Sequence, residues 1–217
     1  MTTSERTAMR ELYDHRMAAR TGTGRYAYDE IHSSSDYCPY CSFGEVYELD
    51  HFLPKESFYD LNVFPQNLLP ICHPCNHLKR QKRPAGPNEG FLHPYFDRLP
   101  EDVRWLFAEL EIRDGGPTLT YFVSLDEEGY GGLAGKLIYH FRELRLEKRF
   151  RRQATAVLVE LEAEVTQLAY EQEPGQIEAH LLNRADQFGA RNLNSLETAA
   201  YFAAAESKEY CEGNFRN

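Results

Sequence analysis

The chain has 217 residues, of which 42% are hydrophobic, enough for one large domain or one domain with a compact appendage. Its apolar runs are shorter than the roughly 18 residues that span a bilayer, and its N-terminus lacks the apolar middle of a signal peptide. We therefore expect a cytoplasmic protein with no membrane partner. The net charge of −10 argues against nucleic-acid binding through the whole surface.

The N-terminal part of the chain is predicted to be helical. Residues 4–20 have amphipathic spacing, and the sequence TGTG at 21–24 breaks the pattern. We take residues 1–35 as an N-terminal helical segment that precedes a cysteine-rich core at 36–90.

The stretch YELDHFLPK, residues 47–55, resembles a short strand that stops at Pro54. Asp50 and His51 are poor strand formers, and burying them without partners costs free energy. This strand is therefore expected to carry a site that engages both side chains.

Four of the five cysteines occur as two pairs with metal-ligand spacing. CPYC contains Cys38 and Cys41, and CHPC contains Cys72 and Cys75. Two such pairs can place four thiolates tetrahedrally around one zinc ion, which would stabilise a segment with a small core. Thiol redox chemistry and an iron–sulfur cluster are the alternatives. Cys211 is expected to be a small buried apolar residue.

The rest of the chain, residues 91–217, is predicted to hold a hairpin and helices. Apolar residues alternate through 105–125 on both sides of an Asp-Gly-Gly-Pro turn. Helical spacing follows over about 136–171, and shorter helices are expected near 176–188 and 195–211. Because nothing resembles a flexible linker, we expect the parts to pack together.

Basic residues gather in two places despite the net acidity. Residues 135–155 carry seven Lys or Arg against two acids, and residues 76–83 carry four against none. An acidic protein with basic segments can still bind a polyanion locally. A solvated helix face is the alternative for both segments.

The order of these elements resembles the HNH endonuclease superfamily in its zinc-stabilised branch. A Cys-x-x-Cys pair precedes Asp50-His51, Pro54 comes three residues after the histidine, and Asn67 precedes a second pair followed directly by Asn76. The resemblance covers about residues 36–83 and implies a ββα-metal core. Many members have His at the last position, and this Asn resembles the endonuclease-VII-like variant.

The resemblance implies a role for each matching residue. His51 would be the general base that activates water, and Asn67 would brace the hairpin and help orient the base. Asp50 and Asn76 would hold a catalytic divalent ion, Mg²⁺ or similar, separate from the one structural Zn²⁺ at the cysteines. The basic residues expected to contact substrate phosphate are Lys79, Arg80, Lys82 and Arg83.

The residue types suit phosphodiester hydrolysis. Carboxylate and amide oxygens are ligands that a hard cation prefers, and an imidazole has the basicity to take a proton from water near neutral pH. The other ring nitrogen of His51 should donate to a carbonyl that fixes the tautomer. Because neighbouring strand residues point to opposite faces, we also expect a twist or bulge at Asp50-His51.

The sequence thus predicts an α+β protein: a small ββα-metal HNH core with a four-cysteine zinc site, embedded in a mostly helical domain with an additional β-hairpin. The predicted function is a metal-dependent endonuclease that cuts DNA, in a setting such as bacterial anti-phage defence or restriction. The alternatives are a zinc-stabilised nucleic-acid-binding module, or a nuclease subunit activated by a protein partner such as an ATPase. A homodimer is a further possibility, since one centre cuts one strand.

Overall fold

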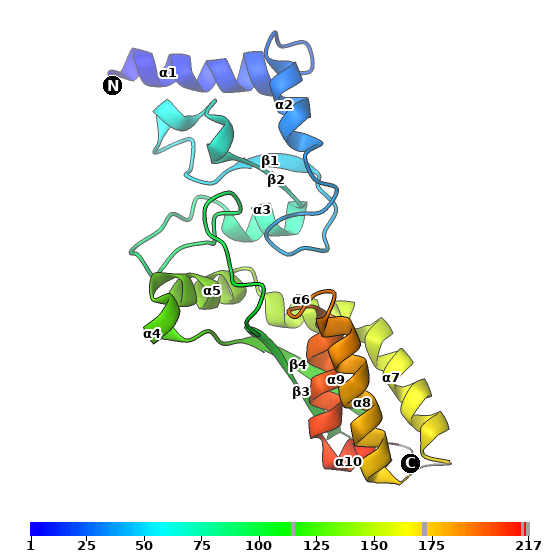
Figure 1. The fold of residues 1–217 in the computed structure, drawn as a ribbon. Helices are drawn as coiled ribbons and strands as arrows, with labels where there is room; N and C mark the ends of the chain where they lie inside the picture. The colour runs from blue at the N-terminus through cyan, green and yellow to red at the C-terminus, as the bar shows by residue number, and fades with distance from the viewer. Residues whose placement is uncertain (114–115, 171–172, 214, 216–217) are drawn as a thin grey trace. The chain divides into compact units, whose positions relative to one another are not determined.

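The computed structural model describes residues 1–113, 116–170, 173–213 and 215. The chain divides into two compact units, Met1–Arg98 and Leu99–Asn217 (Figure 1). The expected N-terminal segment, residues 1–35, therefore lies in the same unit as the cysteine-rich core. The expected start of the third region at residue 91 falls before the division between the units.

Unit 1 begins with two helical segments of different pitch rather than the single helix expected over 4–20. Helix α1 (Thr3–Glu11) starts with a capping box between Thr2 and Glu5 and continues into the π-helix η1 (Leu12–Ala18). A turn then leads to helix α2 (Arg25–His32). Gly22 is required in this turn, because an added Cβ would lie 2.2 Å from the Arg16 carbonyl oxygen.

A two-stranded hairpin followed by a helix forms the centre of unit 1. Strand β1 (Glu48–His51) pairs antiparallel with β2 (Leu68–Ile71), and helix α3 (His73–Lys79) follows directly. The 3₁₀ turns η2 (Tyr59–Leu61) and η3 (Pro65–Asn67) lie in the connection between the strands. The pairing is continuous from Glu48↔Ile71 to His51↔Leu68, so β1 has no bulge at Asp50-His51, and a twist is the remaining form of the expected irregularity.

The hairpin is held against the N-terminal helices by a small apolar cluster. Its buried members are Tyr13, Met17, Leu49 and Leu68. Two come from η1 and one from each strand, so the N-terminal segment supports the strand that carries Asp50 and His51. This packing explains why residues 1–35 do not form a separate region.

Unit 2 contains the expected hairpin. Strand β3 (Leu106–Arg113) pairs antiparallel with β4 (Gly116–Val123), from Leu106↔Val123 to Arg113↔Gly116. The two middle residues of the expected turn, 114 and 115, lie outside the described residues.

Three helices replace the single helix expected over 136–171. They follow the short helix α4 (Glu127–Tyr130) and are α5 (Gly132–Glu143), α6 (Leu146–Gln153) and α7 (Thr155–Leu168). The first break is at Arg145, which has a φ of 51° and so leaves the right-handed helical region. The expected helix end at residue 171 lies outside the described residues.

The last helices of unit 2 follow the sequence prediction more closely. Pro174 begins α8 (Pro174–Gly189), a position that suits its missing N–H. The Ser195 side chain caps α9 (Leu196–Glu206), and α10 (Lys208–Cys211) follows. Helix α9 packs against both α8 and β3 (Figure 1). Among the described residues, nineteen are buried in the resulting core, including Leu119, Leu161 and Leu181.

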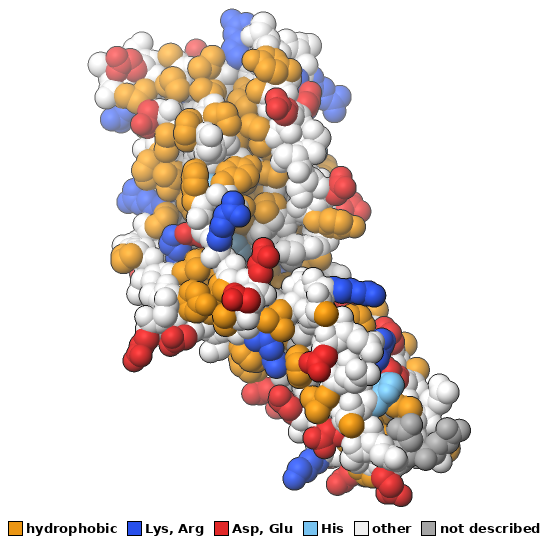
Figure 2. All heavy atoms as spheres, in the orientation of Figure 1, with side chains coloured by type: hydrophobic (Ala, Val, Ile, Leu, Met, Phe, Trp, Pro, Cys, Tyr) orange, Lys and Arg blue, Asp and Glu red, His pale blue; other side chains and the backbone are white. Residues whose placement is uncertain are grey.

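The two units also differ in charge. Residues 1–98 carry eleven Lys or Arg against thirteen acids, whereas residues 99–217 carry thirteen against twenty-one. On the face drawn in Figure 2, hydrophobic side chains gather over unit 1 and acidic side chains recur along unit 2. Among the described residues, none of the helices combines the length and apolarity that crossing a membrane requires.

Candidate functional site

Unit 1 brings the four paired cysteines together in its interior. The sulfur atoms of Cys38, Cys41, Cys72 and Cys75 all lie within 4.8 Å of one another, and all four residues are buried. The Cys41 and Cys72 sulfurs are 3.8 Å apart. Tetrahedral zinc with Zn–S bonds of about 2.3 Å requires sulfurs about 3.8 Å apart. The cluster could therefore hold a metal ion such as zinc.

The first cysteine pair sits in a tight turn that depends on Gly44. The Cys38 amide donates to the Gly44 carbonyl at 2.7 Å, and the Gly44 amide approaches the Cys41 sulfur at 3.4 Å. A Cβ at residue 44 would lie 2.8 Å from the Cys72 sulfur. Gly44 is thus part of the cluster, although the cysteine spacing alone gave no reason to select it.

The second pair enters the cluster from the start of α3. Cys72 immediately precedes the helix, Pro74 occupies its first turn, and Cys75 points into the interior. Hydrogen bonding to Cys38 and the other two sulfurs raises the pKa of Cys75. Four thiolates this close would repel one another, and a bound cation would offset that repulsion.

His51, at the end of β1, is held as the sequence analysis expected of a general base. Its ring is buried, and Nε2 lies 2.9 Å from the Asn62 carbonyl oxygen. Nε2–H must donate in this contact, so Nδ1 carries the free lone pair. Burial lowers the pKa of His51 to about 4, which leaves the imidazole neutral at neutral pH.

Two asparagines support the loop around His51, and sequence reasoning found only one of them. The Asn67 side chain donates to the Leu53 and Leu61 carbonyls and accepts from the Leu53 amide at 2.8 Å, which matches the expected bracing role. Asn62, not Asn67, supplies the carbonyl to His51. Asn62 is fully buried, and its side-chain amide has no hydrogen-bond partner among the described residues.

Asp50 is held by a lysine that was expected to face substrate. Lys79 Nζ lies 2.7 Å from Asp50 Oδ2 and donates to the His51 carbonyl at 2.7 Å. Because Lys79 is completely buried, the prediction that it contacts substrate phosphate is wrong. It instead ties α3 to β1. Burial raises the pKa of Asp50, and the Lys79 charge opposes that rise.

One cavity brings together three of the four residues predicted to be catalytic, and Asn67 is not among the residues that line it. It has a volume of about 300 Å³, and Asp50, His51 and Asn76 all line it. Asp50 and His51 reach it from the end of β1, and Asn76 reaches it from α3. The walls also include Tyr13 from the N-terminal segment and Lys55 from the loop after β1.

The other three predicted phosphate-binding residues have different positions. Arg80 lines the cavity and is exposed, whereas Lys82 and Arg83 are not among the residues that line it. Arg80 has φ 51° and ψ −131°, a backbone region that favours glycine.

The donor set in the cavity suits a hard divalent ion with few protein ligands. Asp50 offers a carboxylate and Asn76 a side-chain carbonyl, and such ions commonly take their remaining ligands from water and phosphate. Among the residues that the structure describes, one group of three or more His, Cys, Asp or Glu side chains has its ligand atoms close enough to hold a metal ion. That group is the four cysteines.

A comparison with known proteins relates the chain to a phage protein. The chain is 27% identical over 160 residues to Protein ea31 of Escherichia phage lambda, a match that covers 70% of this chain and 53% of that protein. The chain thus spans about half the length of this relative. No family model matches the chain, and no solved structure matches it.

Proposed function

We propose that the chain is a metal-dependent endonuclease of the HNH type that hydrolyses DNA phosphodiester bonds. The observation that carries the proposal is that Asp50, His51 and Asn76 line one cavity, in the same unit as the four-cysteine cluster. A carboxylate, a neutral imidazole and an amide in one hollow match the chemical needs of phosphate hydrolysis.

His51 supplies the base. Its Nδ1 takes a proton from the attacking water, while Nε2–H continues to donate to the Asn62 carbonyl. That carbonyl fixes the tautomer and stabilises the imidazolium once it forms, as an orienting acceptor does for other catalytic histidines. The neutral state that burial imposes keeps the base ready at neutral pH.

Asp50 and Asn76 would hold the divalent ion. The ion pair with Lys79 fixes the position of the Asp50 carboxylate. When bound, the ion polarises the phosphate and stabilises charge on the leaving oxygen. Arg80, at the edge of the cavity, contacts a phosphate oxygen of the substrate. Zinc at the four cysteines serves a structural role, because a closed four-sulfur site leaves no ligand position for substrate.

The decisive experiment is cleavage of supercoiled plasmid in Mg²⁺, Mn²⁺ or Ni²⁺, each beside a chelator control. We expect His51→Ala to lower the rate by about a hundredfold to ten-thousandfold while one zinc per chain is retained. His15→Ala, an exposed histidine in the same unit, is the matched control. Equal cleavage by His51→Ala and the parent protein would refute the role given to His51.

Two other functions predict different outcomes of the same assay. Binding of DNA with no cleavage in any metal would favour a zinc-stabilised binding module. Cleavage that appears only after a second protein, such as an ATPase, is added would favour a partner-activated subunit. Single nicks would indicate a monomer, and double-strand cuts a homodimer.

An anti-phage setting remains a hypothesis, and the phage origin of the ea31 relative does not favour host defence over a phage function.

A further inference from the structure

Tyr13 lies outside the motif but forms part of the same cavity. It comes from the π-helix η1, and its ring is buried against His51. The ring centroids are 4.4 Å apart and the planes are inclined by 71°, an edge-to-face contact. Because Tyr13 also lines the cavity, the N-terminal segment supplies one wall of the candidate active site.

Core packing explains the Tyr13 ring but not its hydroxyl. The ring belongs to the apolar cluster with Met17, Leu49 and Leu68. Within the described ranges, no residue exchanges a hydrogen bond with the hydroxyl, and the oxygen is not among the buried polar atoms that lack a partner. The Tyr210 hydroxyl, in contrast, is sealed in the interior of unit 2. The Tyr13 hydroxyl oxygen therefore keeps some access to solvent, and Tyr13 lines the cavity.

Ion pairs hold the segment that presents Tyr13 against the loop that follows His51. Lys55 Nζ is 2.9 Å from Asp14 Oδ1 and 5.4 Å from the centre of the Tyr13 ring. Arg10 and Glu56 form a second pair at 2.7 Å. Lys55 and Glu56 line the cavity as well. These contacts fix Tyr13 in the wall of the cavity, next to Lys55.

We propose that Tyr13 is a further active-site residue, which holds the His51 ring through its edge and donates its hydroxyl hydrogen to a non-bridging oxygen of the bound phosphodiester. The proposal deepens the nuclease function and rests on it for the catalytic part. The ligand class is a phosphodiester anion, which can accept a hydrogen bond from a neutral phenol.

The test separates the hydroxyl from the ring. Tyr13→Phe keeps the ring and removes the donor, whereas Tyr13→Leu removes both. Tyr26→Phe, a 74% exposed tyrosine on α2, is the matched control. The measurements are plasmid cleavage in Mg²⁺, and titration of the zinc-loaded chain with the dinucleotide TpT in Ca²⁺, followed by the NMR signal of the His51 ring.

We expect Tyr13→Phe to weaken TpT binding and slow cleavage about tenfold or more, the usual effect of losing a hydrogen bond to a charged group. Without TpT, the NMR chemical shift of the His51 ring should be unchanged in Tyr13→Phe. It should change in Tyr13→Leu, because only that variant removes the neighbouring aromatic ring. Tyr26→Phe should match the parent protein in all measurements.

The readouts distinguish failure of this proposal from failure of the nuclease function. TpT binding that depends on the Tyr13 hydroxyl, in a chain that cleaves nothing, would refute the nuclease function and support Tyr13 as a phosphodiester ligand. Cleavage and TpT binding at parental levels in Tyr13→Phe would overturn the Tyr13 proposal while the nuclease function stands. A parent chain that neither binds TpT nor cleaves would overturn both.

Discussion

The two units are stabilised in different ways. In unit 1, four of the buried apolar residues are the clustered cysteines, and the apolar cluster behind the hairpin has four buried members. In unit 2, nineteen buried residues form one core around the β3–β4 hairpin and its helices. The unit with the candidate chemistry is thus the one built around a cluster that could hold a metal ion, whereas the other resembles an ordinary packed domain.

Removing the metal should have the largest effect and should break unit 1 alone. Structural zinc contributes about 10–16 kcal/mol in small sites at neutral pH, more than the stability of most whole domains. We expect Cys75→Ser to abolish zinc binding and unfold unit 1. The single tryptophan, Trp105, lies in unit 2, so its fluorescence should still report a cooperative transition.

Cys211→Ser is the matched control, because this buried cysteine belongs to unit 2 and is not a member of the cluster. It should keep one zinc per chain. Retention of zinc and of the hairpin signals in Cys75→Ser would contradict a metal-dependent unit 1. Gly44→Ala should resemble Cys75→Ser in weakening zinc binding, since the added methyl group meets the Cys72 sulfur.

The second prediction concerns the buried ion pair of unit 1. Lys79→Met leaves Asp50 buried without its cation, which should destabilise the zinc-loaded chain by about 3–5 kcal/mol in denaturant unfolding. Arg83→Met, an exposed base just after α3, should change stability little. The double variant Lys79→Met, Asp50→Leu should recover most of the loss, because both charges are then gone. A Lys79→Met chain as stable as the parent would show that the pair is not needed.

The cysteine spacing predicted the four-sulfur cluster, because metal geometry leaves few other uses for two such pairs. Alternation likewise predicted the hairpin over 105–125. The sequence could not reveal that Lys79 is buried, since only the contact with Asp50, twenty-nine positions earlier in the chain, makes its burial tolerable. Tyr13 and Asn62 were missed for the same reason: their roles come from tertiary contacts with His51. The helix break at Arg145 rests on a positive φ that arginine rarely adopts.

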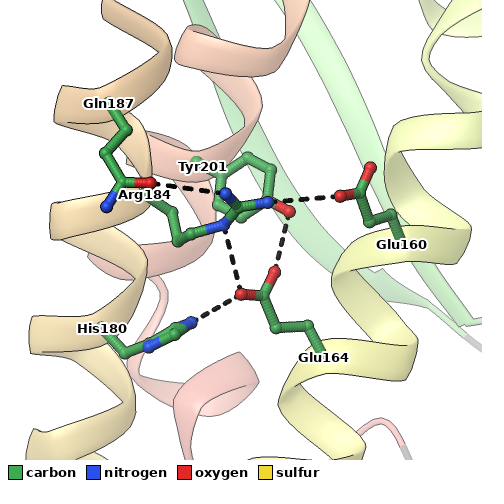
Figure 3. A network of polar contacts seen from close by, with 6 residues as sticks. All are labelled: Glu160, Glu164, His180, Arg184, Gln187 and Tyr201. Carbon is green, nitrogen blue, oxygen red and sulfur yellow. Dashed lines mark hydrogen bonds and ion pairs between the residues drawn. The ribbon is translucent and has the colours of Figure 1, made fainter.

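A polar network in unit 2 gives the third prediction. The Glu164 carboxylate on α7 accepts from the Tyr201 hydroxyl at 2.8 Å, and His180 and Arg184 on α8 contact its other oxygen (Figure 3). Tyr201→Phe removes a buried donor to a charged group and should cost about 1.5–3 kcal/mol. Trp105 fluorescence should report this loss while zinc content stays constant.

Gln187 lies at the edge of the same network, 3.5 Å from Arg184, and is the matched control. Gln187→Ala should change stability by less than about 0.5 kcal/mol. A loss of zinc affinity in Tyr201→Phe would contradict the prediction that this change affects unit 2 alone.

The smallest expected effect is a pH dependence of unit 2. Burial raises the pKa of Cys211 to about 11, whereas an unfolded thiol ionises near 9. Between these values the unfolded chain binds fewer protons than the folded one, so stability falls as the pH rises. At pH 10 the loss should be about 1 kcal/mol relative to pH 8. Cys211→Ala, which has no thiol to ionise, should lose less over the same interval when Trp105 fluorescence follows unfolding. Equal losses of stability in both proteins would show that burial of this thiol does not cause the fall in unit 2 stability between pH 8 and pH 10.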